Sequence, residues 1–269
     1  MAKKRIEFKS WRSFTAFAQK IFQENRFIHD KETRDFLRAV LKTCDARIRV
    51  IEKGTLLWRA QLGCDTHKDT EANRLIAEEI LPYPPDRMKP LIGQASEGRA
   101  NPKGIPYLYL SNNKNTALAE VRPWVGTQIS ISKFKVKQEI RIVDCSVSHN
   151  LKIPFYCCEL EPSIREEVVW AFIDKAFARP IQSSDNTADY VPTQIIAELF
   201  KTQGFDGIKY QSNLGAGQNI ILFNIDLAEI VSCSLYKTTK LRFHFEEIKI
   251  GPKNRYITMH YYNSLRGKT

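Results

Sequence analysis

Six polar side chains in this sequence of 269 residues have types and positions that could carry chemistry. They are Arg59, Arg99, Tyr109, Glu120, Ser212 and Asn219. Most fall at the ends of predicted strands or in glycine-bearing loops, where a cleft built on a sheet collects its ligands. Two arginines can grip a pyrophosphate through charge-assisted hydrogen bonds, and a tyrosine ring can stack on a flat heterocycle. A carboxylate can hydrogen-bond a ribose hydroxyl and stabilise positive charge on an anomeric carbon.

These residue types suit cleavage of the nicotinamide N-glycosidic bond of NAD. Nicotinamide leaves a cationic glycoside as a neutral molecule, so no general acid is needed, and the oxocarbenium-like transition state must be stabilised instead. One buried carboxylate aimed at that charge contributes on the order of 3 kcal/mol or more. Glu120 is the candidate, because it is the carboxylate of an otherwise small and apolar helix, Ala-Leu-Ala-Glu-Val. We expect it to be partly desolvated and therefore to need a compensating partner.

Each residue also has an ordinary structural interpretation. Tyr109 could be a core residue, Glu120 could pair with Arg122 or Arg59, and the serine and asparagine could be turn residues. The loop at residues 215–217 contains two glycines, whose backbone N–H groups could approach an anion closely. This pair alone is weak support, since it lacks the strand–GxGxxG–helix context of a dinucleotide fold.

The central stretch of the chain divides into four predicted elements. Residues 99–104 form a loop marked by Asn-Pro and Gly, and residues 105–110 form a strand rich in aromatic and β-branched residues. Residues 111–115 form a polar turn that ends in a helix N-cap, and residues 116–122 form a helix stopped by a proline.

The elements around this stretch define an α+β fold. Apolar spacing predicts two N-terminal helices, one from a cap at Ser10 and one from Asp30 through Ile51 to Gly54. In the strand at residues 55–61, Leu57, Arg59 and Gln61 share a face, which suits a cleft wall. Residues 63–98 are polar and include four prolines between residues 82 and 90, so we expect a long loop acting as a lid. Further predicted strands are 129–136, 140–143, 207–211 and 220–223, further helices are 163–178 and 192–203, and residues 241–262 are expected to form a β-hairpin.

The composition limits the possible classes of protein. The formal net charge of +11 indicates an anionic partner, with the basic residues spread along the chain. No apolar run approaches the roughly 20 residues that span a bilayer, and the basic N-terminus is followed by no apolar stretch, so we expect neither membrane nor secretion. The six cysteines form no C-x-x-C pair, so we expect reduced thiols in a cytoplasmic protein and no metal site. A nucleophilic pair of Cys145 and His149 receives little weight.

Five ordered sequence pieces together resemble the RES-domain family, named for its arginine, glutamate and serine. They cover about residues 54–225 and are specific as a set. The pieces are Leu57-Trp58-Arg59-Ala60, Gly98-Arg99-Ala100-Asn101-Pro102-Lys103-Gly104, Tyr107-Leu108-Tyr109-Leu110-Ser111, Ala117-Leu118-Ala119-Glu120-Val121, and Gly204-Phe205-Asp206-Gly207-Ile208 continued by Tyr210-Gln211-Ser212.

The resemblance implies a fold similar to that of ADP-ribosyltransferases, with mixed sheets and packed helices. It also implies a bacterial toxin that arrests growth by degrading NAD, with phosphate or water as acceptor and no true cofactor. Glu120 would be the catalytic carboxylate, Arg59 and Arg99 would bind phosphates or order the ribose, and Tyr109 would stack near nicotinamide. Ser212 would hold the ligand or the acceptor, and Asn219 completes the substrate-binding set.

The expected organisation has three parts: an N-terminal helical extension at residues 1–53, a RES-like catalytic domain at 54–235, and a C-terminal hairpin extension at 236–269. Compact members of the family lack both extensions and the long 63–98 loop. An antitoxin protein that occludes the active site is an expected partner, and the sequence leaves a homo-oligomer open.

Two other functions stay open at this stage. The same site could transfer ADP-ribose to a macromolecule, in which case label from NAD would remain on protein or nucleic acid. A basic nucleic-acid-binding module would instead show affinity that falls steeply with salt and ignores Glu120. We rank that module last, because no recognition-helix, RNP or zinc-finger pattern is present.

Overall fold

The computed structural model describes residues 7–71, 74–151, 158–179, 187–242, 244–245 and 247. The chain separates into two units, residues 1–238 and residues 239–269. The described residues of the second unit contain no helix or strand. Most of the C-terminal hairpin expected at residues 241–262 lies outside the described residues, so it stays a prediction.

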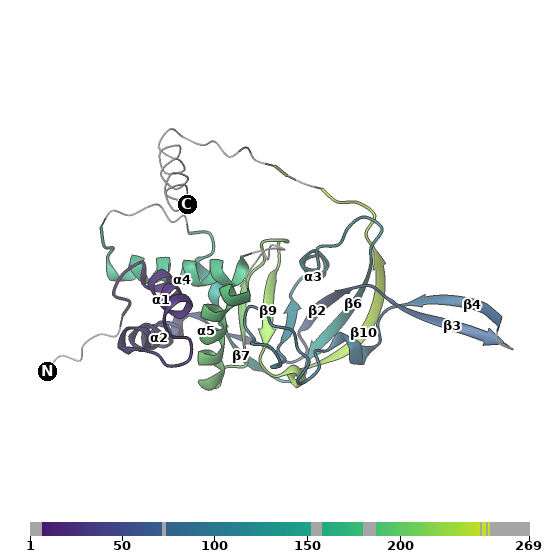
Figure 1. The fold of residues 1–269 in the computed structure, drawn as a ribbon, viewed down its shortest axis with the longest axis horizontal. Helices are drawn as coiled ribbons and strands as arrows, with labels where there is room; N and C mark the ends of the chain where they lie inside the picture. Colours follow the sequence, from purple (N-terminus) through teal and green to yellow (C-terminus); the bar gives the residue numbers. More distant parts are fainter. Residues whose placement is uncertain are drawn as a thin grey trace, which may run out of the picture. The chain divides into compact units, whose positions relative to one another are not determined.

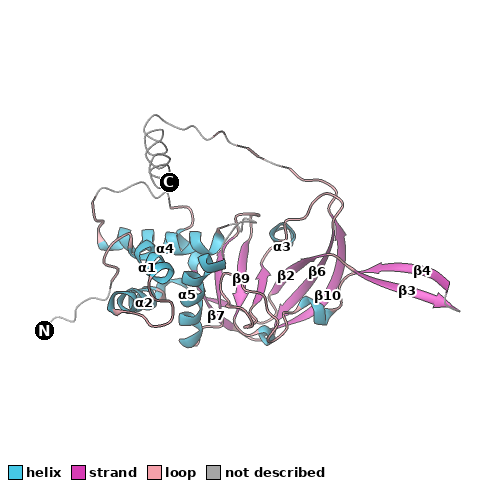
Figure 2. Ribbon diagram, viewed as in Figure 1, coloured by secondary structure: helices cyan, strands magenta, loops and turns pink. Residues whose placement is uncertain are grey.

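The first unit is built on a mixed sheet of eight strands in the order β1-β7-β8-β9-β5-β2-β6-β10. Strands β7 and β8 pair in parallel, and the other neighbours pair antiparallel. Figure 2 shows these strands with helices around them, which confirms the α+β class. The strands are β1 (Ile48–Ile51), β2 (Leu56–Leu62), β5 (Leu108–Ser111), β6 (Gln128–Val136), β7 (Ile140–Asp144), β8 (Gly207–Gln211), β9 (Gln218–Leu222) and β10 (Ala228–Lys237).

Four helices pack together on one side of the sheet: α4 and α5 contact β8, and α1 and α2 pack against α4 and α5 (Figure 1). They are α1 (Ser13–Gln23), α2 (Lys31–Thr43), α4 (Pro162–Ala178) and α5 (Val191–Thr202). One continuous apolar cluster includes Phe17 and Phe36 of the N-terminal pair together with Trp170 and Phe200 of the other pair. The N-terminal helices therefore complete the core of the first unit, because their apolar faces are buried in the same cluster as α4 and α5.

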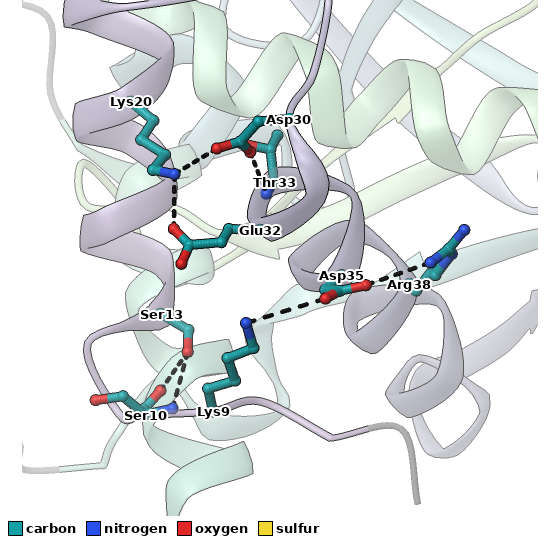
Figure 3. A network of polar contacts seen from close by, with 9 residues as sticks. All are labelled: Lys9, Ser10, Ser13, Lys20, Asp30, Glu32, Thr33, Asp35 and Arg38. Atoms are coloured by element: carbon teal, nitrogen blue, oxygen red, sulfur yellow. Dashed lines mark hydrogen bonds and ion pairs between the residues drawn. The ribbon is translucent and has the colours of Figure 1, made fainter. Parts of the chain in front are cut away.

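A polar network ties α1 to the start of α2 (Figure 3). Lys20 Nζ lies 2.5 Å from Asp30 Oδ2 and 2.6 Å from Glu32 Oε2. Asp30 also caps α2, because its Oδ1 accepts a hydrogen bond from Thr33 N at 2.8 Å, as the sequence predicted. The hydrogen bonds from Lys20 hold the pKa of both carboxyls below their usual range. These pairs are solvated, so they set the geometry of the two helices more than their stability.

Two sequence expectations about secondary structure are wrong. The second helix ends at Thr43 rather than near Gly54, and residues 48–51 form β1, which pairs with β7. Residues 63–98 are no structureless loop, because they include the hairpin β3 (Asp65–Glu71) and β4 (Arg74–Leu81) (Figure 2). The edge strand β10 was not foreseen. The helix and strand boundaries elsewhere agree with prediction to within about three residues.

One buried hydroxyl fastens both ends of the β3–β4 hairpin to the sheet. Ser130 Oγ in β6 donates to Gly63 O at 2.8 Å and accepts from Tyr83 N at 2.9 Å. Ser130 is fully buried. The chain thus leaves and re-enters the body of the unit at one point.

The short helix α3 (Lys114–Glu120) crosses β2, β5 and β6. Asn113 caps it, because its Oδ1 accepts from Asn115 N at 2.9 Å and from Thr116 N at 3.1 Å. Ala117 packs in a small apolar cluster with strand residues, which fixes the rotation of the helix. The rotation of α3 about its axis sets the direction of the side chain of Glu120, the last residue of the helix.

Candidate active site

Glu120 is held at the end of α3 by two side chains from neighbouring strands. Ser212 Oγ donates to Glu120 Oε1 at 2.6 Å, and Asn219 Nδ2 donates to the same oxygen at 2.6 Å. Ser212 directly follows β8, Asn219 lies in β9, and both are buried. Three residues predicted from the sequence therefore meet at one carboxylate, whose orientation is fixed by two charge-assisted hydrogen bonds.

The direction of the Ser212 hydrogen bond follows from its other partners. Its Oγ accepts from Leu214 N and from Gly215 N, both at 3.1 Å. A hydroxyl has one proton to donate, so with both acceptor positions in use the proton points to Glu120. Ser212 therefore stabilises the loop that follows it by accepting two backbone hydrogen bonds, and it orients the Glu120 carboxylate by donating a third.

The glycine loop after Ser212 serves packing rather than anion binding. Gly217 N donates to Thr116 Oγ1 at 2.9 Å, and Gly215 N is used by Ser212. A Cβ on Gly215 would lie 2.5 Å from Thr116 Oγ1, and one on Gly217 would lie 2.6 Å from Asn113 Cβ. The expectation that these N–H groups face an anion is wrong, and glycine is needed because the loop touches the start of α3.

A cavity of about 330 Å³ opens beside Glu120. Its lining includes Arg99 and the rings of Tyr109 and Tyr210, and Asn219 forms part of its wall. Glu120 itself is exposed, so the expectation of a desolvated carboxylate is wrong. Glu120 thus lines the cavity as an exposed residue, and two buried donors set the orientation of its carboxylate.

Tyr109 contributes its ring to the cavity and its hydroxyl to the neighbouring loop. The hydroxyl donates to Asn101 Oδ1 at 2.7 Å and accepts from Ala100 N at 3.1 Å. Burial raises the pKa of Tyr109 above its ordinary value, so the group stays neutral. Gly98 packs against the same hydroxyl, since a Cβ there would lie 2.6 Å from it. Tyr109 thus supplies a stacking surface and fixes the loop that carries Arg99.

Arg99 is anchored on one side and open to the cavity on the other. Its Nη1 donates to Phe177 O at 2.6 Å, at the end of α4, and its own carbonyl accepts from Thr193 Oγ1 at 2.6 Å. Gln194 Nε2 holds the same loop by donating to Gly98 O at 2.9 Å. A guanidinium has five N–H donors, so the remaining donors suit an anionic ligand in the cavity.

Arg59 is not among the residues that line the cavity. Its Nη1 donates to Tyr109 O at 3.3 Å, where β2 and β5 separate after their pairing at Trp58 and Ser111. Its Nε is buried with no hydrogen-bond partner among the described residues, and burial lowers its pKa. Arg59 therefore supports the strand that carries Tyr109, and its expected roles in a cleft wall and in catalysis stay predictions.

Tyr210 and Arg122 are among the lining residues that sequence reasoning did not propose for the site. Tyr210 lies in β8 two residues before Ser212, so the strand period of two could have placed it on the same face. Burial raises its pKa as well. Arg122 follows α3 with φ of 49°, in the left-handed region, and among the described non-glycine residues no other has a positive φ. Nothing in the local sequence signals that conformation.

The alternative nucleophile has no support in the structure. Cys145 is fully buried, and burial raises the pKa of its thiol well above the ordinary value. His149 Nδ1 lies 2.5 Å from Asp174 Oδ2, and Asp174 Oδ1 accepts from Gln211 N at 3.3 Å. Asp174 is buried and His149 is partly exposed, and the pair supports the end of β8 just before Ser212.

The described part of the chain contains no group of three or more His, Cys, Asp or Glu side chains placed to hold a metal ion. It also contains no helix with the length and apolar character required to cross a bilayer.

The chain belongs to the RES-domain family, because the family model for the RES domain matches residues 57–246. The resemblance inferred from the sequence is thereby confirmed. No curated protein matches the chain. A solved structure that is similar comes from the Mycobacterium tuberculosis MbcT–MbcA toxin–antitoxin complex, with 14% identity and a TM-score of 0.38. The alignment covers 74% of this chain and 92% of that chain.

Proposed function

We propose that this protein degrades NAD by cleaving the bond between nicotinamide and ribose. The observation that carries the proposal is the carboxylate of Glu120, oriented by Ser212 and Asn219 at the rim of a cavity that Arg99 also lines. Membership of the RES-domain family supports the same chemistry. In this assignment the rings of Tyr109 and Tyr210 receive the flat nicotinamide ring, and Arg99 binds the pyrophosphate.

The reaction needs little from the protein besides charge and position. The C–N bond breaks with its electron pair going to the pyridinium nitrogen, so nicotinamide leaves neutral and the ribose becomes cationic. Glu120 stabilises that cation, and phosphate or water then forms the new C–O bond and releases a proton. Glu120 is exposed in the free chain, and a bound dinucleotide that covers the rim displaces water and strengthens the electrostatic interaction.

The test is product analysis by mass spectrometry after incubation with NAD, with and without inorganic phosphate. ADP-ribose identifies hydrolysis, and ADP-ribose 1″-phosphate identifies phosphorolysis. Glu120→Gln keeps the shape of the side chain and is expected to lower turnover on the order of 100-fold or more. Glu139→Gln is the matched control, because it removes the same charge from an exposed residue between β6 and β7. Full turnover by Glu120→Gln would refute the mechanism.

A macromolecular acceptor is the second candidate, and the exposure of Glu120 is the observation that favours it. A cation formed at an open rim can be reached by a side chain or a nucleotide of another molecule. In that case radiolabel from the ADP-ribose part of NAD stays on protein or nucleic acid, instead of appearing in small products.

The proposed biological role is growth arrest through loss of NAD, restrained by an antitoxin that covers the cavity. Expression of the wild-type chain in bacteria should lower cellular NAD before growth stops, whereas Glu120→Gln should do neither. Growth arrest with normal NAD levels would contradict this role. A partner that occludes the cavity should compete with NAD in a direct binding assay.

A further inference from the structure

A second cavity shares Arg99 with the candidate active site. Its volume is about 200 Å³, and it lies between α1, the end of α4 and the short helix η4 (Thr187–Tyr190) that leads into α5. Arg99 lines both cavities. Phe177 lines the first and Ala176 the second, so both cavities border the last turn of α4.

We propose that this second cavity binds the adenosine half of the dinucleotide whose nicotinamide half occupies the first cavity. The inference rests on the proposed function. In this proposal, α1 lines the substrate site in addition to contributing to the apolar core.

The chemistry of the lining fits a purine nucleotide. Phe14 and Phe22 of α1 provide aromatic surface, and Arg179 adds a second cation beside Arg99. Asp189 provides a carboxylate that can accept from an amino group or a ribose hydroxyl. Aromatic side chains that stack on a base, together with arginines that bind its phosphate, are the usual means of holding a nucleotide without a dedicated loop.

The exposure of Phe22 sets it apart from the rest of the apolar stripe on α1. Phe14, Phe17 and Ile21 are buried, whereas Phe22 is 43% exposed. Helix packing accounts for the first three residues, because they belong to the shared core. Phe22 instead presents its ring to the cavity, and a stacked base would remove that apolar surface from water.

The order of the groups agrees with the covalent structure of a dinucleotide. The pyrophosphate joins the two nucleosides, and Arg99 lies at the junction of the two cavities. Arg99 is also fixed there, by its hydrogen bond to Phe177 O at 2.6 Å and by Thr193 on its carbonyl. Because the family match begins at residue 57, the α1 wall is contributed by a segment outside the matched region.

The decisive variant is Phe22→Ala, measured with two substrates. Nicotinamide mononucleotide keeps the nicotinamide ribose and one phosphate but lacks the adenosine half. We expect Phe22→Ala to lower kcat/KM for NAD about tenfold relative to kcat/KM for the mononucleotide, since base stacking on an aromatic ring is lost. Phe22→Trp should restore the ratio. Phe27→Ala is the matched control, because Phe27 is 90% exposed and lies outside both cavities.

A binding experiment separates this inference from the proposed function. AMP titrated into the wild-type chain should bind, and the affinity should fall about tenfold in Phe22→Ala but not in Phe27→Ala. Absence of AMP binding, or equal binding by Phe22→Ala, would overturn the inference even if NAD is cleaved. Equal loss of activity on both substrates would overturn it as well. Failure of the wild-type chain to release nicotinamide would refute the proposed function, and the AMP titration would still decide the role of the cavity.

Discussion

The contact between Asn219 and Glu120 allows a quantitative test of the catalytic role proposed for the Glu120 carboxylate. Asn219→Asp keeps the size of the side chain but places a second carboxylate beside Glu120 Oε1, which now accepts from Asn219 Nδ2 at 2.6 Å. Two like charges that relax to about 4 Å repel by about 1 kcal/mol in water and about 4 kcal/mol at an effective dielectric constant near 20. Glu120 is exposed, so we expect a value near the lower limit.

This repulsion should appear as a shift in the pH dependence of the reaction. A difference of 1.36 kcal/mol corresponds to one pH unit. Because repulsion favours protonation of the pair, the acid limb of kcat/KM for nicotinamide release should move upward by about one pH unit in Asn219→Asp. The two carboxylates titrate as a pair, so the shift belongs to the pair rather than to one residue.

Asn219→Ala is the control, since it removes the same hydrogen bond without adding charge. The two variants should differ most at low ionic strength and approach each other at high salt, because salt screens exposed charges. Thermal melts of both proteins would show that the strand still folds. If the acid limbs of the two variants coincide at low salt, Glu120 is not the charge on which the reaction depends.

Three further outcomes follow from the structure. Gly98→Ala should lower the melting temperature and the activity together, because the new Cβ would lie 2.6 Å from the Tyr109 hydroxyl and overpacking costs about 1–3 kcal/mol; an unchanged melt would contradict this. Burial raises the pKa of Tyr107 to about 12 and also raises the pKa of Tyr210, so both tyrosines ionise at lower pH in the unfolded chain than in the folded one. The free energy of unfolding, measured by urea titration, should therefore be retained below about pH 10 and should fall as the pH rises toward about 12. At Arg122, with φ of 49°, the Gly variant should be more stable than the Ala variant by about 1 kcal/mol in chemical denaturation, which is the reverse of their usual order in a helix.

The predictable parts of the fold were those with strong local signals. Helix α5 begins with a proline at its second position and is followed by Gly204, whose φ is +82°, so both ends were visible in the sequence. Strand β1 was hidden because Ile48 and Ile51 satisfy the helical spacing as well as they satisfy pairing with β7. The hairpin β3–β4 was hidden because β3 is polar throughout and the apolar residues of β4 do not alternate with polar ones.

The site shows a similar division. Sequence reasoning identified Glu120, Ser212 and Asn219, and the structure brings the serine and the asparagine within hydrogen-bond distance of the glutamate. The sequence correctly assigned a common face to Leu57 and Arg59, but it could not say which face borders the cavity. That depends on the separation of β2 from β5, a tertiary feature with no local signal.

The fastening of the β3–β4 hairpin by Ser130 has a consequence for how this protein can be modified. Gly63 and Tyr83 stay joined through one hydroxyl whatever the intervening chain does. Shortening the β3–β4 hairpin, or replacing it with an affinity tag or a fluorescent label, should therefore leave the loop that carries Arg99 undisturbed. For the same reason, we expect the length of the β3–β4 hairpin to tolerate variation, because both of its ends are bound to the side chain of Ser130.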